Sequence, residues 1–401
     1  MYFRGIYRFT ATACQHLMHS LSCGIVAVYA VISLTACHGR HGNTAEIDGD
    51  TLAYAYSTLL TTVCHDTYTE TQIADPWNKG HVLQCYWLVD RKDSAKVGRA
   101  PEGVTKVIVP LRRAVLSTSS VCYLLLTLGG ADGVKGVCDS KYVKGMPYYR
   151  DKLSRGVIVD CGDGMSPSVE KISDMEADAV FLSAYQGSDF SRLTRLHVPV
   201  IYCAEYMEQH PLGRAEWMKF YGMLMGCGRQ ADSLFTRVTS EYNRLKAGAA
   251  KAATRPLVLT ERIYGDTWFC PGGNSTVARM ISDAHARYAF HDDSHQGSLP
   301  LSEETVISKA SDTDIWLFTY SGDHPLTKKE LLTECRGYSQ IKAFQTNGIY
   351  QCNNMTSRFF DETSFRPDFL LADYVRIFHP EIFDKGQLRY YLRCSPRYYE
   401  H

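Results

Sequence analysis

Short apolar runs alternate with amphipathic stretches over most of the chain beyond residue 112. Four such runs precede residue 203, at 113–117, 157–160, 179–182 and 198–202. Three more follow residue 255, at 256–259, 315–318 and 348–350. Continuous apolar runs separated by helical segments are typical of strands buried in a parallel sheet. The pattern therefore predicts an α/β protein with two groups of mainly parallel strands.

One long amphipathic segment, residues 229–250, separates the two groups. Apolar side chains recur there at steps of three and four residues, at Ala231, Leu234, Phe235, Val238, Tyr242 and Leu245. This spacing predicts a single helix. The sequence thus predicts two Rossmann-like lobes with mainly parallel sheets, joined by one long α-helix, with a ligand cleft between the lobes. The expected boundaries are 113–228 for the first lobe, 229–250 for the helix, and 251–401 for the second lobe with helices at 367–378 and around 388–392.

Residues 37–112 form a more polar and irregular extension before the first lobe. Side chains alternate in character through Gln84, Tyr86 and Leu88, and again through Val104, Val107 and Val109. Alternation with a period of two indicates strands. We expect the extension to pack on the first lobe and to cover one of its edges.

The N-terminal 36 residues have the layout of an export signal. Arg4 and Arg8 precede an apolar stretch, and small residues lead up to Cys37. The sequence Leu-Thr-Ala-Cys at 34–37 resembles the lipobox of bacterial lipoproteins, in which the cysteine is acylated and anchors the protein. A transmembrane anchor and an ordinary cleaved signal are the alternatives, and Met18 is a second possible start of translation.

Composition and charge exclude several classes of protein. The 43 basic and 43 acidic side chains cancel, whereas nucleic-acid-binding domains usually carry a basic excess. With 45% hydrophobic and 21% charged residues, the composition is that of an ordinary globular protein. No later stretch is long and apolar enough to indicate a multi-pass transporter.

The 14 cysteines are spread along the chain without a C-x-x-C pair. Eleven lie beyond Cys37, and an odd number cannot all pair within one chain. Many interrupt apolar runs, as Cys122, Cys161 and Cys203 do, where a buried thiol behaves as a small hydrophobic side chain. Free structural thiols are the favoured interpretation, with some disulfides or a metal cluster as alternatives.

The two halves repeat one local pattern. In each half a serine-capped helix with an early glutamate precedes a strand that ends near a tyrosine, which gives the pairs Glu170 with Tyr185 and Glu304 with Tyr320. A carboxylate near a helix N-terminus is ordinary by itself, but two in matching positions would form a paired acidic surface. Ligands of open α/β sheets bind beyond the carboxyl ends of the strands, so both tyrosines are candidate ligand contacts.

These features resemble the solute-binding lipoproteins of importers for iron chelates and cobalamin, whose two lobes are joined by one long helix. The resemblance covers roughly 114–379. Besides the lipobox it rests on five segments: SPSVEKISDMEADAVFLSAY, EYMEQHPLGRAEWMKFYGMLMGCG, WFCPGGNSTVARMISDA, LSEETVISKASDTDIWLF and RPDFLLADYVRIFHPE. It implies capture of a ferric siderophore, haem or a corrinoid, and delivery to a permease driven by an ATPase. It also implies a monomer lipid-anchored at Cys37 on the periplasmic side of a bacterial membrane, without a resident cofactor or nucleic acid.

The resemblance also assigns roles to single residues. Glu170 and Glu304 match the two glutamates that engage arginines of the permease subunits. The segment 266–275 matches a loop that faces the cleft, where Trp268 would stack on a planar or bulky ligand, with a core position as the alternative. Arg262, after the first strand of the second lobe, would meet ligand carboxylates or catecholates.

Two further groups are weaker candidates. Arg358 and Phe359 precede the closing helices and are possible ligand contacts. The segment 291–295, His-Asp-Asp-Ser-His, looks like the histidine and carboxylate set of a related branch that binds bare zinc or manganese. Its position predicts a solvated connection on the outside of the second lobe, so a metal site is not expected.

The sequence favours a binding protein over an enzyme. It lacks the phosphate-binding G-x-x-x-x-G-K-[ST] pattern of the ATPase motor and the G-x-S-x-G and H-E-x-x-H patterns of common hydrolases. Two alternatives stay open, since fold alone does not decide function. They are an enzyme that handles tetrapyrroles or metals, which would need a general acid or base in the cleft, and a surface lipoprotein that scavenges haem.

Overall fold

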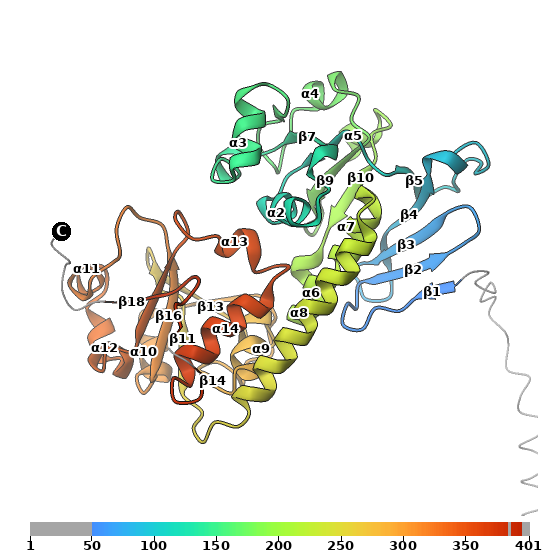
Figure 1. Cartoon of the computed structure of the whole chain (residues 1–401). Helices are drawn as coiled ribbons and strands as arrows, with labels where there is room; N and C mark the ends of the chain where they lie inside the picture. Colours follow the sequence, from blue (N-terminus) through green and yellow to red (C-terminus); the bar gives the residue numbers. More distant parts are fainter. Residues whose placement is uncertain (1–49, 384–385, 395–401) are drawn as a thin grey trace, which may run out of the picture. The chain divides into compact units, whose positions relative to one another are not determined.

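The computed structural model describes residues 50–383 and 386–394 (Figure 1). The expected signal peptide and Cys37 lie outside these residues. The described residues belong to one compact unit. The secondary structure is mixed α/β with mainly parallel sheets in two lobes, as the apolar runs predict.

The extension folds as a five-stranded sheet in the order β1-β2-β3-β4-β5. Its strands are β1 (Asp50–Leu52), β2 (Leu60–Cys64), β3 (Thr69–Ala74), β4 (Val82–Asp90) and β5 (Val104–Val109). The first four pair antiparallel and β5 joins β4 in parallel. The strands expected from the two alternating segments are therefore present as β4 and β5.

The sheet of the first lobe is entirely parallel, in the order β10-β9-β6-β7-β8. Its strands are β6 (Ala114–Leu116), β7 (Val134–Val137), β8 (Val159–Asp160), β9 (Ala179–Ser183) and β10 (Val200–Cys203). The connecting helices are α2 (Ser119–Leu128), α3 (Pro147–Ser154), α4 (Val169–Asp174) and α5 (Ser191–Thr194). The apolar runs predict four of the five strands, and β7 is the one they miss.

Three consecutive helices follow this sheet: α6 (Pro211–Glu216), α7 (Met218–Met225) and α8 (Gly228–Ala249). Gly226 ends α7 in the left-handed conformation, with φ of 72°, which suits a residue without Cβ. A Cβ on Gly222 would lie 2.7 Å from that of Ala231, so a glycine is required where α7 and α8 approach. The predicted apolar positions of α8 are all buried.

The main sheet of the second lobe has the order β14-β11-β16-β17-β18. Its strands are β11 (Leu257–Thr260), β14 (Arg287–Tyr288), β16 (Ile315–Tyr320), β17 (Ile349–Asn353) and β18 (Leu392–Arg393), of which only β18 is antiparallel to its neighbour. A small antiparallel sheet consists of β12 (Ile263–Tyr264), β13 (Thr267–Pro271) and β15 (Ser298–Leu301).

The helices of this lobe are α9 (Thr276–Asp283), α10 (Glu303–Ala310), α11 (Lys328–Glu334), α12 (Lys342–Gln345), α13 (Phe359–Glu362) and α14 (Pro367–Phe378). Five 3-10 turns complete the described secondary structure: η1 (Arg91–Asp93), η2 (Ala131–Gly133), η3 (Ser140–Tyr142), η4 (Glu205–Met207) and η5 (Arg336–Gln340). The prediction of a helix at 367–378 is confirmed by α14.

The helix expected around 388–392 is wrong. The backbone N–H groups of Arg389 and Tyr390 donate to the carboxylate of Asp373, each at 2.8 Å, and Leu392 pairs with Gln351 in β17. These long-range bonds hold the segment extended, and a local helical pattern cannot reveal them.

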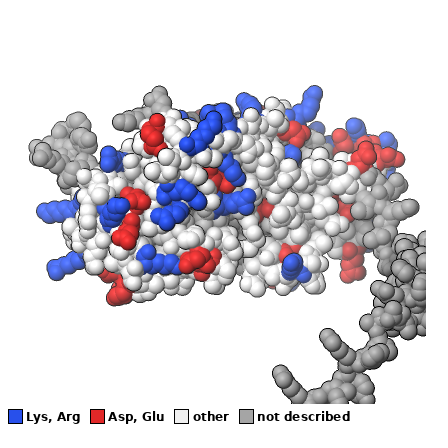
Figure 2. Space-filling view, turned by 90° about the horizontal axis from the view of Figure 1, so that it is seen from below, with Lys and Arg blue, Asp and Glu red and all other residues white. Residues whose placement is uncertain are grey.

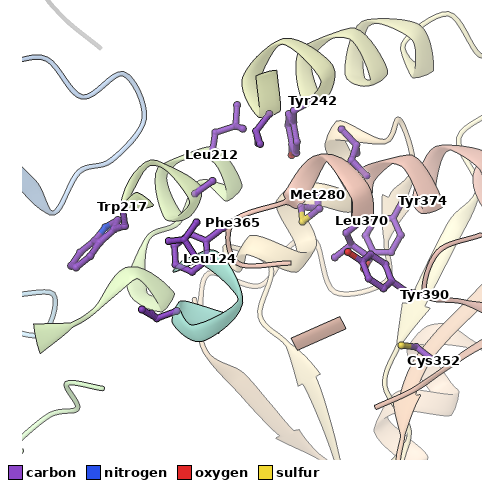
Figure 3. Packing of buried hydrophobic residues seen from close by; sticks show 14 of the residues in the cluster. Leu124, Leu212, Trp217, Tyr242, Met280, Cys352, Phe365, Leu370, Tyr374 and Tyr390 are labelled. Carbon is purple, nitrogen blue, oxygen red and sulfur yellow. The ribbon is translucent and has the colours of Figure 1, made fainter. Parts of the chain in front are cut away.

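The hydrophobic core continues from the extension into both lobes. Figure 3 shows Leu212 of α6, Tyr242 of α8, Met280 of α9 and Leu370 of α14 among its buried side chains. Helix α8 contacts α7 and α14, so it is buried along the stripe that its sequence predicts. The cysteines from Cys64 to Cys352 are free thiols, and all of them except Cys64 and Cys85 are buried.

Two buried glutamates attach the extension to the segment around α6. The fully buried carboxylate of Glu216 accepts hydrogen bonds from the backbone N–H groups of residues 55, 56 and 57, at 2.8–3.0 Å, and pairs with Lys219 at 2.9 Å. Glu208 binds the backbone N–H groups of residues 58 and 59 and the indole N–H of Trp217. Charged acceptors thus satisfy five consecutive backbone donors.

Candidate ligand-binding site

A cavity of about 340 Å³ lies at the carboxyl ends of β11 and β16. Glu261 and Arg262 follow β11 directly, and Thr319 is the second-to-last residue of β16. Tyr264, Phe269 and Ser298 of the small sheet line the other side. Because β11 and β16 are parallel neighbours, their carboxyl ends meet at the same edge, where open α/β sheets bind ligands.

Glu261 is held in an unusual backbone conformation, with φ of 61°. Its N–H donates to the Leu317 carbonyl at 2.8 Å, and its carbonyl accepts the indole N–H of Trp316 at 2.7 Å. A residue other than glycine in the left-handed region costs free energy, and such residues concentrate at functional sites. Burial raises the pKa of the Glu261 carboxyl to about 7. The sequence patterns do not mark Glu261 as a site residue.

Arg262 lines the same cavity, but its guanidinium is already paired. Its guanidinium forms an ion pair with Glu334, at the end of α11, and both side chains are about a quarter exposed, at 24% and 29%. Its Nε atom is buried without a hydrogen-bond partner among the residues described. A ligand carboxylate at Arg262 would therefore compete with Glu334, and 72 residues of sequence separate the two partners.

Trp268 does not line this cavity; it lies in the core beneath it, fully buried. Its indole N–H donates to the Thr260 carbonyl at 3.3 Å, and its ring packs edge-on against Tyr338 at 5.4 Å. Strand β13 alternates, so Trp268 and Cys270 point inward while Phe269 points outward. The aromatic contact that the cavity offers is thus Phe269 and not Trp268.

The exposed aromatic rings of the cavity are Tyr264, 80% exposed, and Phe269, 45% exposed. Tyr264 pairs with Thr267 in the β12–β13 hairpin, which brings the two aromatic residues to one small sheet. Neither Tyr264 nor Phe269 is among the residues predicted from the sequence. The alternation of Trp268, Phe269 and Cys270 is the signal that could have identified Phe269 as the outward-facing residue.

The two tyrosines of the internal repeat differ in exposure. Tyr185, two residues beyond β9, is 39% exposed, whereas Tyr320, the last residue of β16, is 3% exposed. The Tyr206 hydroxyl donates to the carbonyl of Ala184 at 2.6 Å, beside Tyr185. Tyr206 also lines a cavity of about 200 Å³ together with Asn274 of the second lobe. Tyr185 is accessible to a ligand, and Tyr320 is a core residue in this conformation.

Both glutamates of the repeat lie at helix starts and are exposed. Ser168 caps α4 through its side chain and places Glu170 in the first turn, and Ser302 does the same for Glu304 in α10. Glu303, the neighbour of Glu304, packs over Gly337, where a Cβ would lie 2.1 Å from the Glu303 carboxylate. Hydrogen bonds from its own backbone N–H and from the Ser302 side chain lower the pKa of Glu304.

The weaker candidates lie elsewhere. The guanidinium of Arg358 stacks on Tyr123 of α2, 5.3 Å from its ring centroid, and Phe359 packs against Tyr390. The segment 291–295 is a connection without helix or strand, as predicted, and its carboxylates bind nearby groups: Asp292 pairs with Lys309 at 2.7 Å and Asp293 with His295 at 3.0 Å.

The chain belongs to the periplasmic binding protein family, whose model matches residues 114–356. It is similar to two uncharacterized lipoproteins of Methanocaldococcus jannaschii. The first is 30% identical over 305 residues, which cover 72% of this chain and 70% of the relative. The second is 26% identical over 352 residues, which cover 82% and 86%. The match to the family confirms the resemblance drawn from the sequence motifs.

Solved structures give the same fold at low sequence identity. A periplasmic haem-binding protein of Pseudomonas aeruginosa aligns with a TM-score of 0.56 and 16% identity, covering 72% of this chain and 99% of that one. An apo haem-binding protein of Roseiflexus sp. RS-1 aligns with a TM-score of 0.54 and 20% identity, covering 68% and 100%. These neighbours and the family are solute-binding proteins. Within the described part of the chain, no helix has the length and apolar character needed to cross a membrane.

Proposed function

We propose that this protein is the substrate-binding lipoprotein of an ABC importer. It would capture an iron chelate, either a siderophore or haem, or cobalamin, and deliver it to a permease powered by an ATPase. The observation that carries this proposal is the cavity at the carboxyl ends of β11 and β16, where two exposed aromatic rings stand beside an arginine. Its volume of about 340 Å³ is within the usual range for small-molecule sites.

The chemistry of the cavity suits a bulky ligand with anionic groups. Tyr264 and Phe269 offer apolar faces for a planar or conjugated ligand. Arg262 would exchange its bond to Glu334 for a ligand carboxylate or catecholate, since a guanidinium binds such groups bidentately. Tyr185 would contribute from the first lobe, whereas the buried positions of Trp268 and Tyr320 support a structural role for them.

Lipid anchoring at Cys37 is part of this proposal, supported by the lipobox and by the lipoprotein relatives. Acylation would hold the protein, as a monomer, at the outer face of the membrane that contains its permease. The exposed carboxylates of Glu170 and Glu304 would each meet an arginine of that permease.

Fluorescence quenching of the full-length protein tests ligand capture. Trp316 donates its indole N–H to the Glu261 carbonyl, so a ligand in the cavity would change tryptophan emission. Haem, a ferric siderophore and cobalamin are titrated separately, and one class is expected to bind with a Kd of about 1 μM or below. The double variant Tyr264→Ala/Phe269→Ala should weaken this binding about tenfold or more.

The control is Tyr142→Ala, which removes an aromatic ring that is 62% exposed and lies outside the cavity. It should leave the Kd unchanged. The absence of binding by all three ligand classes, or equal weakening by the control, would contradict the proposal.

One observation favours a second candidate, an enzyme that handles tetrapyrroles or metals. Glu261, with its pKa raised to about 7, is a group able to act as a general acid or base in the cavity. The two functions differ in turnover. If the protein is an enzyme, the wild type incubated with excess haem would release iron from the haem catalytically, and Glu261→Gln would not. A binding protein returns the ligand unchanged.

A further inference from the structure

A second cavity, of about 450 Å³, is lined by three arginines and a histidine: Arg255, Arg279, Arg287 and His291. It lies against α9 and the edge strand β14 and shares no lining residue with the first cavity. No carboxylate is among its lining residues. On the face shown in Figure 2, Lys and Arg side chains lie over the second lobe with Asp and Glu side chains between them. The protein as a whole is neutral, so the excess of basic residues in the lining of the cavity is local.

The three guanidinium groups come from three different elements. Arg255 precedes β11 and is fixed by one hydrogen bond, 3.2 Å long, to the carbonyl of Ala286. Arg279 lies in α9, and Arg287 in β14. The side chain of Arg287 is exposed, and its charge acts on Asp314, which is itself paired with Lys342 at 2.7 Å. Donors carried by separate rigid elements can be held in a fixed arrangement around one ligand.

The acidic groups nearest to the cavity are engaged elsewhere. Asp283, 7% exposed, accepts a hydrogen bond from Tyr242 at 2.9 Å and pairs with Lys246 at 2.8 Å. Arg279 is 3.8 Å from the same carboxylate and stays 49% exposed. Asp293 binds His295 and the backbone N–H of Gly273. Two carboxylates, Asp283 and Asp314, therefore act on the three arginines, and each of them is also paired with a lysine, which leaves an excess of positive charge.

The positive charge of these arginines lowers the pKa of two neighbouring histidines. The pKa of His210 is lowered first by burial and then by Arg279, and that of His285 first by burial and then by Arg255. Ser275, the N-cap of α9, also lines the cavity, so the positive end of this helix adds to the field.

We propose that this cavity binds an oxyanion of the phosphate type with more than one negative charge. Planar guanidinium groups recognise phosphate oxygens bidentately, and three of them match a diphosphate better than a single carboxylate. The phosphate would belong either to a soluble anion or to the headgroup of an anionic lipid. The site is separate from the cavity proposed for the transported ligand.

Calorimetric titration of the full-length protein in detergent with inorganic pyrophosphate tests the proposal. In buffer containing about 0.15 M salt, which screens unspecific attraction, we expect saturable binding. The double variant Arg279→Gln/Arg287→Gln should raise the Kd about tenfold or more. The matched control Arg192→Gln/Arg195→Gln removes two exposed arginines of the first lobe and should leave the Kd within about twofold.

Failure to bind pyrophosphate, or equal loss in the two double variants, would overturn the proposal. If the double variant is poorly folded by circular dichroism, Arg287→Gln alone replaces it, because Arg287 is exposed and Asp314, on which its charge acts, keeps its ion pair with Lys342. Competition then identifies the source of the phosphate. Displacement by short-chain phosphatidylglycerol, but not by phosphatidylcholine, indicates a lipid headgroup, and no displacement by either indicates a soluble anion. The transported ligand is absent throughout, so the result does not depend on the import function.

Discussion

Tyr86, in the N-terminal sheet, accepts through its hydroxyl a hydrogen bond from the backbone N–H of Tyr202, at the edge of the first-lobe sheet, with 2.9 Å between the two atoms. The same hydroxyl donates to the carbonyl of Val200, also at 2.9 Å. Both partners lie in the edge strand β10. One fully buried side chain therefore satisfies a donor and an acceptor that an open sheet edge would present to another chain.

Replacing Tyr86 by phenylalanine should lower the free energy of unfolding by about 1–3 kcal/mol. The ring remains, but two buried backbone groups lose their partner. Urea denaturation of the full-length protein measures the change. Tyr148→Phe is the control, because its hydroxyl meets Asp132 at an exposed position. Equal losses of unfolding free energy in the two variants would mean that the hydrogen bonds of Tyr86 to β10 stabilise the fold no more than an exposed hydrogen bond does.

Replacing Glu216 by glutamine should cost about 3 kcal/mol or more, since a buried charged acceptor is lost and an amide N–H₂ then faces backbone donors. The extension should also detach locally, so that proteases cleave near residues 55–57 under native conditions. Denaturation and timed proteolysis report the two effects.

The matched control for that experiment is Glu170→Gln. Glu170 is exposed and has no ion pair among the described residues, so neither stability nor proteolysis should change measurably. A loss below about 1 kcal/mol in Glu216→Gln would contradict the view that this carboxylate anchors the extension.

Most of the fold could be read from apolar periodicity. The long helix and four of the five first-lobe strands are local patterns, and tertiary packing reinforces them. Strand β7 was not predicted because its four residues include Lys135 and Gly136, which interrupt the apolar run. The terminal helix was mispredicted because Asp373 binds the backbone N–H groups of 389 and 390.

The candidate site could be predicted only in part. The position of Arg262 follows from the rule that open α/β sheets bind ligands beyond the carboxyl ends of their strands. Its ion pair with Glu334 could not be predicted, because it joins residues 72 positions apart. Trp268 was chosen for its residue type, although alternation in β13 gives the outward position to Phe269. The conformation of Glu261 depends on contacts with Leu317 and Trp316, which no local sequence pattern contains.

Trp268→Ala should lower the free energy of unfolding by about 3–5 kcal/mol, because it empties a fully buried site. Phe269→Ala, one residue away, should cost less than about 1 kcal/mol, since that ring is 45% exposed. Urea denaturation compares the two directly. A reversed order would place Phe269 in the core and remove it from the ligand site.

Charge reversal at both docking candidates, Glu170→Lys/Glu304→Lys, should abolish delivery without changing ligand affinity. Each carboxylate is proposed to meet an arginine, and a lysine there would repel it. Stimulation of the permease–ATPase complex in proteoliposomes measures delivery, and fluorescence quenching measures affinity. Glu102→Lys/Glu176→Lys, at two exposed positions elsewhere, is the control. Normal stimulation by the Glu170 and Glu304 variant would exclude these positions as docking points.

Glu261 should make stability depend on pH in a specific direction. Burial raises the pKa of the Glu261 carboxyl from 4.5 to about 7 in the folded protein. Between pH 4.5 and about 7, the folded protein therefore keeps a proton that the unfolded chain has released. Stability from this group is therefore full below about pH 4.5 and falls as the pH rises to about 7, by up to about 3 kcal/mol. Relative to wild type, Glu261→Gln should gain stability across that interval and then level off, as urea denaturation at several pH values would measure.

Glu304→Gln is an internal contrast of opposite sign, because the pKa of Glu304 is lowered and its carboxylate favours the folded state once ionised. A difference between wild type and Glu261→Gln that does not vary with pH would show that the carboxyl titrates normally.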